Sequence, residues 1–179
     1  MNFIAWMIIV CEIGFWIFVI LGLITRYIFK FNKLGFTFLA LTPVIDLVLL
    51  VVTSIDLYQG ATATVAHAVA AIYIGVSIVF GKSMIQWADV RFQYYVMKQG
   101  LKPSKKHGKE FAKQDLKGFG KHLLAYLIGT GFLLVNVFFI NDFSRTFILV
   151  VVAIGWTVTL IIDLLITISY FIWPKKPKA

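Results

Sequence analysis

Long apolar runs alternate with short polar breaks along the whole chain. The apolar runs cover residues 3–25, 36–58, 61–86, 122–140 and 146–173. A helix needs about 20 mostly apolar residues to cross the ~30 Å hydrocarbon core of a bilayer, and each run has about that length. The pattern therefore predicts an all-α fold, in which residues 1–179 form a single membrane domain built as a bundle of five transmembrane helices.

The third run lies in the middle of the chain and is longer than a membrane span requires. From Ala61 to Met97 the sequence predicts one helix, which at about 1.5 Å per residue would be roughly 55 Å long, so its second half should protrude from the membrane. Within it, Ala71 and Gly75 form a small-x-x-x-small pair, which indicates close helix packing. Gln59-Gly60 predicts a tight turn before this helix.

Composition indicates a membrane protein, and five spans of about 20 residues use up most of its length, which leaves no room for a separate soluble domain. The chain has 179 residues, of which 60% are hydrophobic, and its mean hydropathy is +0.90. Soluble domains are about half apolar and a quarter charged, so this protein is expected to be embedded in lipid. The single cysteine, Cys11, lies within the first run and leaves no internal disulfide to form.

Basic residues fall almost entirely on one side of the predicted membrane. If the N-terminus is outside, every lysine and arginine except Arg145 lies on the cytoplasmic side. The positive-inside rule therefore predicts an N-terminus outside and a C-terminus inside. In a membrane protein, the net charge of +9 points to orientation and to anionic lipid at the cytoplasmic face, and nucleic acid is not an expected partner.

The main hydrophilic segment, residues 98–121, carries eight lysines. Ala112, Leu116, Phe119 and Leu123 follow a helical spacing beside a stripe of lysines, which is typical of a helix lying in the headgroup plane. The segment either only sets the orientation of the protein or forms a surface for lipid or a protein partner. The candidate residues of that surface are Lys105, Lys106, Lys109, Lys113 and Lys117.

Ionisable side chains inside the apolar runs are the candidates for chemistry. Glu12 and Asp46 fall near the midplane of adjacent helices, whereas Asp56 and His67 fall near the outer end. Such residues cost several kcal/mol in lipid and normally face the protein interior or a wet cavity. The four residues are interpreted as a cation or proton site, because carboxyl groups in a low dielectric can exchange a proton for a cation. The alternative is a structural hydrogen-bond network between helices.

The second run has two further polar features beside Asp46. Thr42 and Thr53 share its helical face, and Pro43 leaves the carbonyl of Leu39 without its usual amide donor. Helix breaks beside an intramembrane acid recur in transporters, although prolines also occur in spans that have no such role.

Near the inner face, Lys82 and Asp163 lie at similar depth and could form an ion pair. The alternative is that Lys82 extends to the interface and Asp163 bonds locally.

Carboxylates and His67 are suitable metal ligands, but no paired spacing such as H-x-x-x-H occurs. No catalytic residue, metal or cofactor is expected, and the protein is not expected to be an enzyme.

Two stretches carry a resemblance to a known family. The runs Ile72–Ser77 and Gly81–Phe92 resemble a family of small, uncharacterised five-span integral membrane proteins of Gram-positive bacteria. The resemblance implies a multi-pass protein of the cytoplasmic membrane, and it implies no activity or site residues.

Two functions remain open at this point. The first is a cation- or proton-coupled translocator, or a subunit of one. The second is a non-catalytic membrane adaptor or regulatory protein that docks a protein partner or anionic lipid through its basic loop, with a homo-oligomer also possible. Neutralising Glu12 and Asp46 should abolish the first function, and neutralising the loop lysines should abolish the second.

Overall fold

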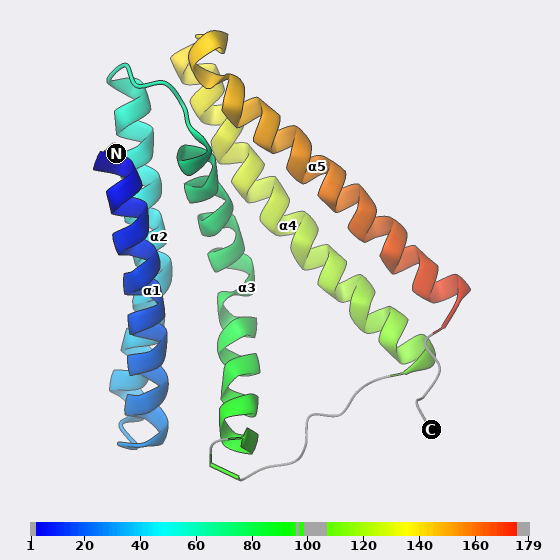
Figure 1. Cartoon of the computed structure of the whole chain (residues 1–179). Coiled ribbons are helices and arrows are strands. Elements are labelled where there is room, and N and C mark those ends of the chain that lie inside the picture. Colours follow the sequence, from blue (N-terminus) through cyan, green and yellow to red (C-terminus); the bar gives the residue numbers. More distant parts are fainter. Residues whose placement is uncertain (1–2, 96, 99–106, 175–179) are drawn as a thin grey trace.

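In the computed structural model, the described part of the chain forms five helices that run back and forth between two ends (Figure 1). The structure describes residues 3–95, 97–98 and 107–174, and these residues contain no strand. Every helix is long and apolar enough to cross a membrane, so the predicted all-α fold with five spans is confirmed. The helices are α1 (Phe3–Tyr27), α2 (Asn32–Tyr58), α3 (Val65–Tyr95), α4 (Gly108–Ile140) and α5 (Phe143–Ile172).

The helices pack in chain order, each mainly against its neighbour in sequence. Within the described residues, α3 is the one helix that contacts all four others. Figure 1 shows α1, α2 and α3 running alongside one another, while α4 and α5 form a pair that leans away from them toward the C-terminal end of the chain. The long central helix, predicted over Ala61–Met97, forms over Val65–Tyr95 and is therefore shorter at both ends. It is the element around which the bundle is organised.

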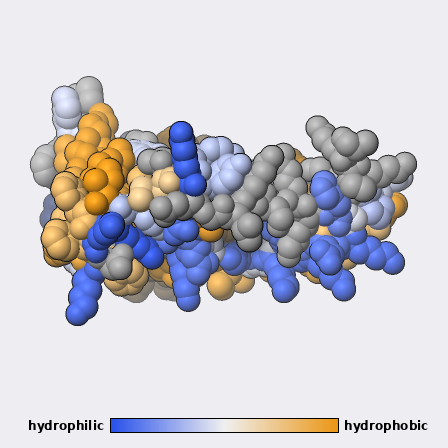
Figure 2. Space-filling model, turned by 90° about the horizontal axis from the view of Figure 1, so that it is seen from below, coloured by the Kyte–Doolittle hydropathy of each residue, from blue (hydrophilic) through white to orange (hydrophobic). Residues whose placement is uncertain are grey.

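The two ends of the bundle differ in charge. One end contains the α1–α2 turn, the end of α3 and the start of α4, and we call it the lysine-rich end because it carries Lys30, Lys33, Lys98 and Lys109. Figure 2 views the molecule from this end and shows hydrophilic side chains gathered across it. The opposite end, which we call the Arg145 end, contains the α2–α3 and α4–α5 connections. The outward position of the N-terminus stays a prediction from this charge distribution.

The basic segment differs from its predicted arrangement. The periodicity correctly predicts a helix, but α4 begins at Gly108 and continues without a break into the fourth span, which was predicted to start at residue 122. The extension is held against α5, because Thr167 donates a 2.9 Å hydrogen bond to Asp115 and the Phe111 ring lies 4.9 Å from the ring of Tyr170. A surface helix separate from the fourth span is therefore not what this segment forms.

Close approach of α3 and α4 depends on glycine. A Cβ atom on Gly75 would lie 2.6 Å from the backbone oxygen of Ala125, and one on Gly129 would lie 3.0 Å from the backbone oxygen of Ala71. Backbone atoms cannot rotate away from such a contact, so only the absence of a side chain permits this crossing. The close packing predicted at Ala71 and Gly75 is confirmed.

Gly75→Ala should destabilise the bundle by about 1–3 kcal/mol, because the added methyl group pushes the α3 and α4 backbones apart. Unfolding of the micelle-embedded protein by increasing mole fractions of SDS measures this change. Gly131→Ala is the matched control, because nothing lies within 4 Å of the position its methyl group would occupy. Equal effects of the two substitutions would contradict the proposed crossing.

Candidate functional site

A stripe of polar side chains runs along the buried face of α2. Thr42, Asp46 and Thr53 are all buried, at 9%, 5% and 2% exposure, and Asp56 continues the same stripe at the Arg145 end. Their spacing of three, four or seven residues keeps them on one face of the helix. The predicted placement of Thr42 and Thr53 on the face of Asp46 is confirmed.

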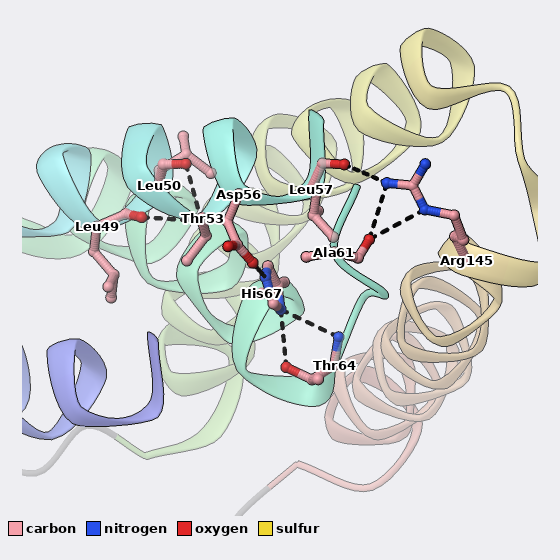
Figure 3. Close-up of polar contacts among 9 residues, drawn as sticks. All are labelled: Leu49, Leu50, Thr53, Asp56, Leu57, Ala61, Thr64, His67 and Arg145. Carbon is pink, nitrogen blue, oxygen red and sulfur yellow. Dashed lines mark hydrogen bonds and ion pairs between the residues drawn. The ribbon is translucent and has the colours of Figure 1, made fainter. Parts of the chain in front are cut away.

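The threonines of this stripe are satisfied within α2 itself. The Thr53 hydroxyl donates to the carbonyls of Leu49 and Leu50 at 2.9 Å (Figure 3). The Thr42 hydroxyl donates to the Leu39 carbonyl at 2.9 Å, which is the carbonyl that Pro43 deprives of an amide donor. The proline therefore creates no open carbonyl in the span, and α2 remains a continuous helix.

Asp46 is buried on α2 and faces α3. The Ser77 hydroxyl of α3 donates a hydrogen bond to Asp46 Oδ2. No lysine, arginine or histidine of the described residues forms an ion pair with Asp46. An ionised carboxylate this deeply buried and without a cationic partner would be unfavourable by several kcal/mol.

A second carboxylate contact lies toward the Arg145 end. His67 is buried at 5% exposure, and its Nε2 lies 3.2 Å from Asp56 Oδ2 (Figure 3). On the other side of the ring, Nδ1 lies 3.1 Å from the backbone nitrogen of Thr64 and 2.8 Å from the Thr64 hydroxyl. His67 is therefore held from both ring nitrogens, between the end of α2 and the start of α3.

The Thr64 contact defines the protonation pattern of the His67 ring. A backbone N–H can only donate, so Nδ1 must accept and carries no proton. The remaining ring proton then sits on Nε2 and is donated to the Asp56 carboxyl group. Protonation at Nδ1 would place two donors face to face, so a positively charged His67 requires the Thr64 contact to open.

Arg145 at the start of α5 fixes the turn that carries this pair. Its guanidinium donates to the carbonyl of Leu57 and, at 3.0 and 3.2 Å, to the carbonyl of Ala61 (Figure 3). Its own carbonyl accepts from the Ala63 amide at 2.8 Å. Arg145, the one basic residue predicted on the outer side, therefore satisfies backbone carbonyls at the end of α2 and links α5 to the α2–α3 connection.

The two carboxylate contacts share one helix register. Asp46 precedes Asp56 by the same number of residues as His67 precedes Ser77, as expected for straight antiparallel helices on either side of a short turn. Ten helical residues separate the two contacts by about 15 Å. The structure thus joins Asp56 with His67, as predicted, and places Asp46 at a different depth with Ser77. The side chain of Glu12 lies outside the described residues, so its role stays a prediction.

Toward the lysine-rich end, a different set of charged side chains forms pairs. Asp163 lies 2.6 Å from His122 Nδ1, and Arg26 pairs with Asp89 at 2.9 Å. The expected pair of Lys82 with Asp163 does not form, because α4 lies directly beside α5 and provides His122, whereas Lys82 on α3 is exposed. These ion pairs link one helix to another, and hydropathy alone does not predict them.

The predicted lysine surface and a possible metal site can both be compared with the described residues. Lys109, Lys113 and Lys117 are exposed on α4, whereas Lys105 and Lys106 lie outside the described residues. Residues 3–95, 97–98 and 107–174 contain no group of three histidine, cysteine, aspartate or glutamate side chains that could hold a metal ion.

Comparison with known proteins places the chain in a family. It is 60% identical over 179 residues to the "Uncharacterized membrane protein YmcC" of Bacillus subtilis (strain 168), and the match covers 100% of this chain and 97% of the relative. The chain belongs to the YmcC family. The predicted resemblance to small membrane proteins of Gram-positive bacteria is confirmed, and with its five membrane-length helices the chain is a multi-pass membrane protein. No family model and no solved structure matches it.

The His67 ring should be found as the neutral tautomer with its proton on Nε2. Nitrogen-15 NMR of labelled histidines in lipid bilayers distinguishes a protonated from an unprotonated Nδ1, and the His67→Gln spectrum identifies the signal. Thr64→Val should retain the tautomer, because the backbone N–H that imposes it is unchanged. A protonated Nδ1 in the folded protein at neutral pH would show that the Thr64 contact is absent.

Proposed function

We propose that this member of the YmcC family is a small cation- or proton-coupled translocator, or a subunit of one, with no catalytic chemistry of its own. The observation that carries the proposal is Asp46, a buried carboxyl group in the α2–α3 interface that has a hydroxyl partner but, among the side chains that the structure describes, no cationic one. Retaining an acid there for packing alone is costly, whereas binding and releasing a proton or cation requires one.

Asp46 and Ser77 can alternate between two satisfied states. With a proton on Asp46, the carboxyl group and the Ser77 hydroxyl exchange hydrogen bonds as two neutral groups. With a cation bound instead, the ionised carboxylate and the Ser77 oxygen are both available as oxygen ligands. A proton and a cation are thus competing occupants of one position, which is the requirement for coupling them.

Asp56 and His67 supply a second proton-binding pair on the same interface. They lie closer to the Arg145 end, about 15 Å from Asp46 along α2, with the buried Thr53 hydroxyl between the two depths. Because α3 carries both Ser77 and His67 and contacts every other helix, a movement of α3 away from α2, with α4 carried along, would alter both pairs together without changing the register. This shared register supports a role for the interface in moving a proton or cation between depths.

The adaptor function remains the second candidate, and one observation favours it. Lys109, Lys113, Lys117 and Lys121 are exposed and follow one another at four-residue spacing on α4. Like charges at this spacing destabilise a helix by about 0.2–0.5 kcal/mol per pair, and an anionic partner would remove that cost. Anionic lipid headgroups or an acidic protein surface would each fit this description.

Asp46→Asn should abolish ion flux in proteoliposomes while leaving the fold intact. The amide has nearly the same shape and can still accept from Ser77, but it cannot take up a proton or neutralise a cation. The measurement is pH-dependent flux of protons and of several monovalent cations, with the wild-type protein, Asp46→Asn and Glu12→Gln compared with empty vesicles.

Glu110→Gln is the matched control, because Glu110 is an exposed carboxylate in the first turn of α4 and its loss should leave the flux unchanged. If wild-type vesicles show no flux above empty ones across these ions and an imposed pH gradient, the translocator proposal fails for the isolated protein. Equal loss of flux in Asp46→Asn and Glu110→Gln would show that the effect is one of overall charge.

A further inference from the structure

A groove on the surface of the bundle is not used by the polar pairs of α2 and α3. It has a volume of about 470 Å³ and lies between α2 and α4 at the Arg145 end. This volume falls in the range of small-molecule sites in proteins, roughly 300–1,000 Å³. Many of its side chains are also exposed, among them Leu47, Val51 and Val135, so the groove opens sideways into the hydrocarbon of the membrane.

The polarity of the groove changes along its length. At the end of the helices it is lined by Tyr58 and Gln59, and about one turn deeper by Ser54 of α2 and Asn136 of α4. Toward the middle of the bundle the lining of α2 is wholly apolar, ending at Leu47. Polar groups near the helix ends with an apolar stretch below them follow the same order as the polar head and apolar tail of a lipid.

The length of the groove also fits a lipid. From Leu47 to Tyr58 the wall formed by α2 extends about 16 Å, at 1.5 Å per residue. One leaflet is half of the ~30 Å hydrocarbon core, or about 15 Å. The length of the groove therefore matches the depth of one leaflet, which is the depth that a single lipid tail fills.

Asn136 provides a group suited to hold the head of such a molecule. Its side-chain nitrogen donates to the Phe132 carbonyl at 2.9 Å, which fixes the orientation of the amide. A polar side chain that lines an apolar groove within a membrane gains most from a ligand whose own polar atoms reach the same depth, such as the ester groups of a phospholipid.

We propose that the α2–α4 groove binds one acyl chain of a membrane phospholipid, with the ester region at Ser54 and Asn136 and the chain end near Leu47. This proposal does not depend on the translocator function. The site holds the lipid longer than an ordinary annular position does, because two helices and a shaped apolar wall surround the chain instead of one convex surface.

Photo-crosslinking from within the lipid tests the proposal. The protein is reconstituted in nanodiscs that contain phosphatidylcholine with a diazirine on one acyl chain, and adducts are mapped by peptide mass spectrometry after illumination. We expect adducts on the groove walls of α2 and α4 to exceed, several-fold, those on equally exposed residues of α5.

Two substitutions separate a site from general lipid contact. Val135→Trp should fill the groove and remove most of the groove adducts. Val158→Trp on α5 should leave them unchanged, although Val158 and Val135 are exposed to the same degree, 51% and 50%. Val51→Trp on the opposite wall is used if Val135→Trp does not fold as judged by gel filtration.

Adducts distributed around the bundle in proportion to exposure would overturn the proposal, as would groove adducts that persist in the folded variant whose groove is filled. A third overturning result is occupancy by a second copy of the chain. In that case Val135→Cys in a Cys11→Ala background would form a disulfide-linked dimer in the nanodisc, while Val158→Cys in the same background would not.

Discussion

The arrangement of this bundle depends on a single constraint: a polar side chain in hydrocarbon must find its partner inside the protein. On α2 the constraint applies to a whole stripe. Thr42 and Thr53 meet it with backbone carbonyls of their own helix, but the carboxyl groups of Asp46 and Asp56 cannot, and both use α3. The α2–α3 register is thus the one that gives Ser77 to Asp46 and His67 to Asp56.

Other contacts lock that register in place. Arg145 ties the start of α5 to the end of α2 through backbone carbonyls, and the Thr64 amide holds His67 at the start of α3. On its other face, α3 lies against α4 at Gly75, where neither helix can slide without a backbone clash. A helix held on several sides transmits a change at one contact to the others, which is why α3 is the element through which protonation of either acid would reach the rest of the protein.

Much of this architecture follows from the sequence, because hydropathy and length measure how a segment partitions into lipid. The five spans, the central place of α3 and the meeting of Asp56 with His67 could be predicted in this way. Two antiparallel helices joined by a short turn keep a fixed register. Once Asp56 is placed beside His67, that register also places Asp46 beside Ser77, ten residues further from the turn on each helix. Ser77 was nevertheless not identified as the partner of Asp46, because a serine in an apolar run gives no signal of its own.

Contacts between helices distant in sequence could not be predicted by depth alone. Asp163 lies at the depth of both Lys82 and His122. Only the packing of α4 against α5 makes His122 the partner of Asp163. The start of α4 at Gly108 also depends on the packing of α4 against α5. Two glycines reduce the helix propensity of this segment by about 1 kcal/mol each, but Asp115 and Phe111 contact α5 and keep the extension helical. Propensity was outweighed by tertiary contacts that the sequence does not display.

The central claim is that Asp46 is not a bare carboxylate in the folded protein but carries a proton or a cation. Infrared spectroscopy of the reconstituted protein tests it most directly, at neutral pH and with a bulky organic cation as the only counterion, so that no small cation can bind. The account predicts the carbonyl band of a protonated carboxylic acid, present in the wild type and absent in Asp46→Asn. Spectra in which that substitution removes only ionised carboxylate bands would contradict it.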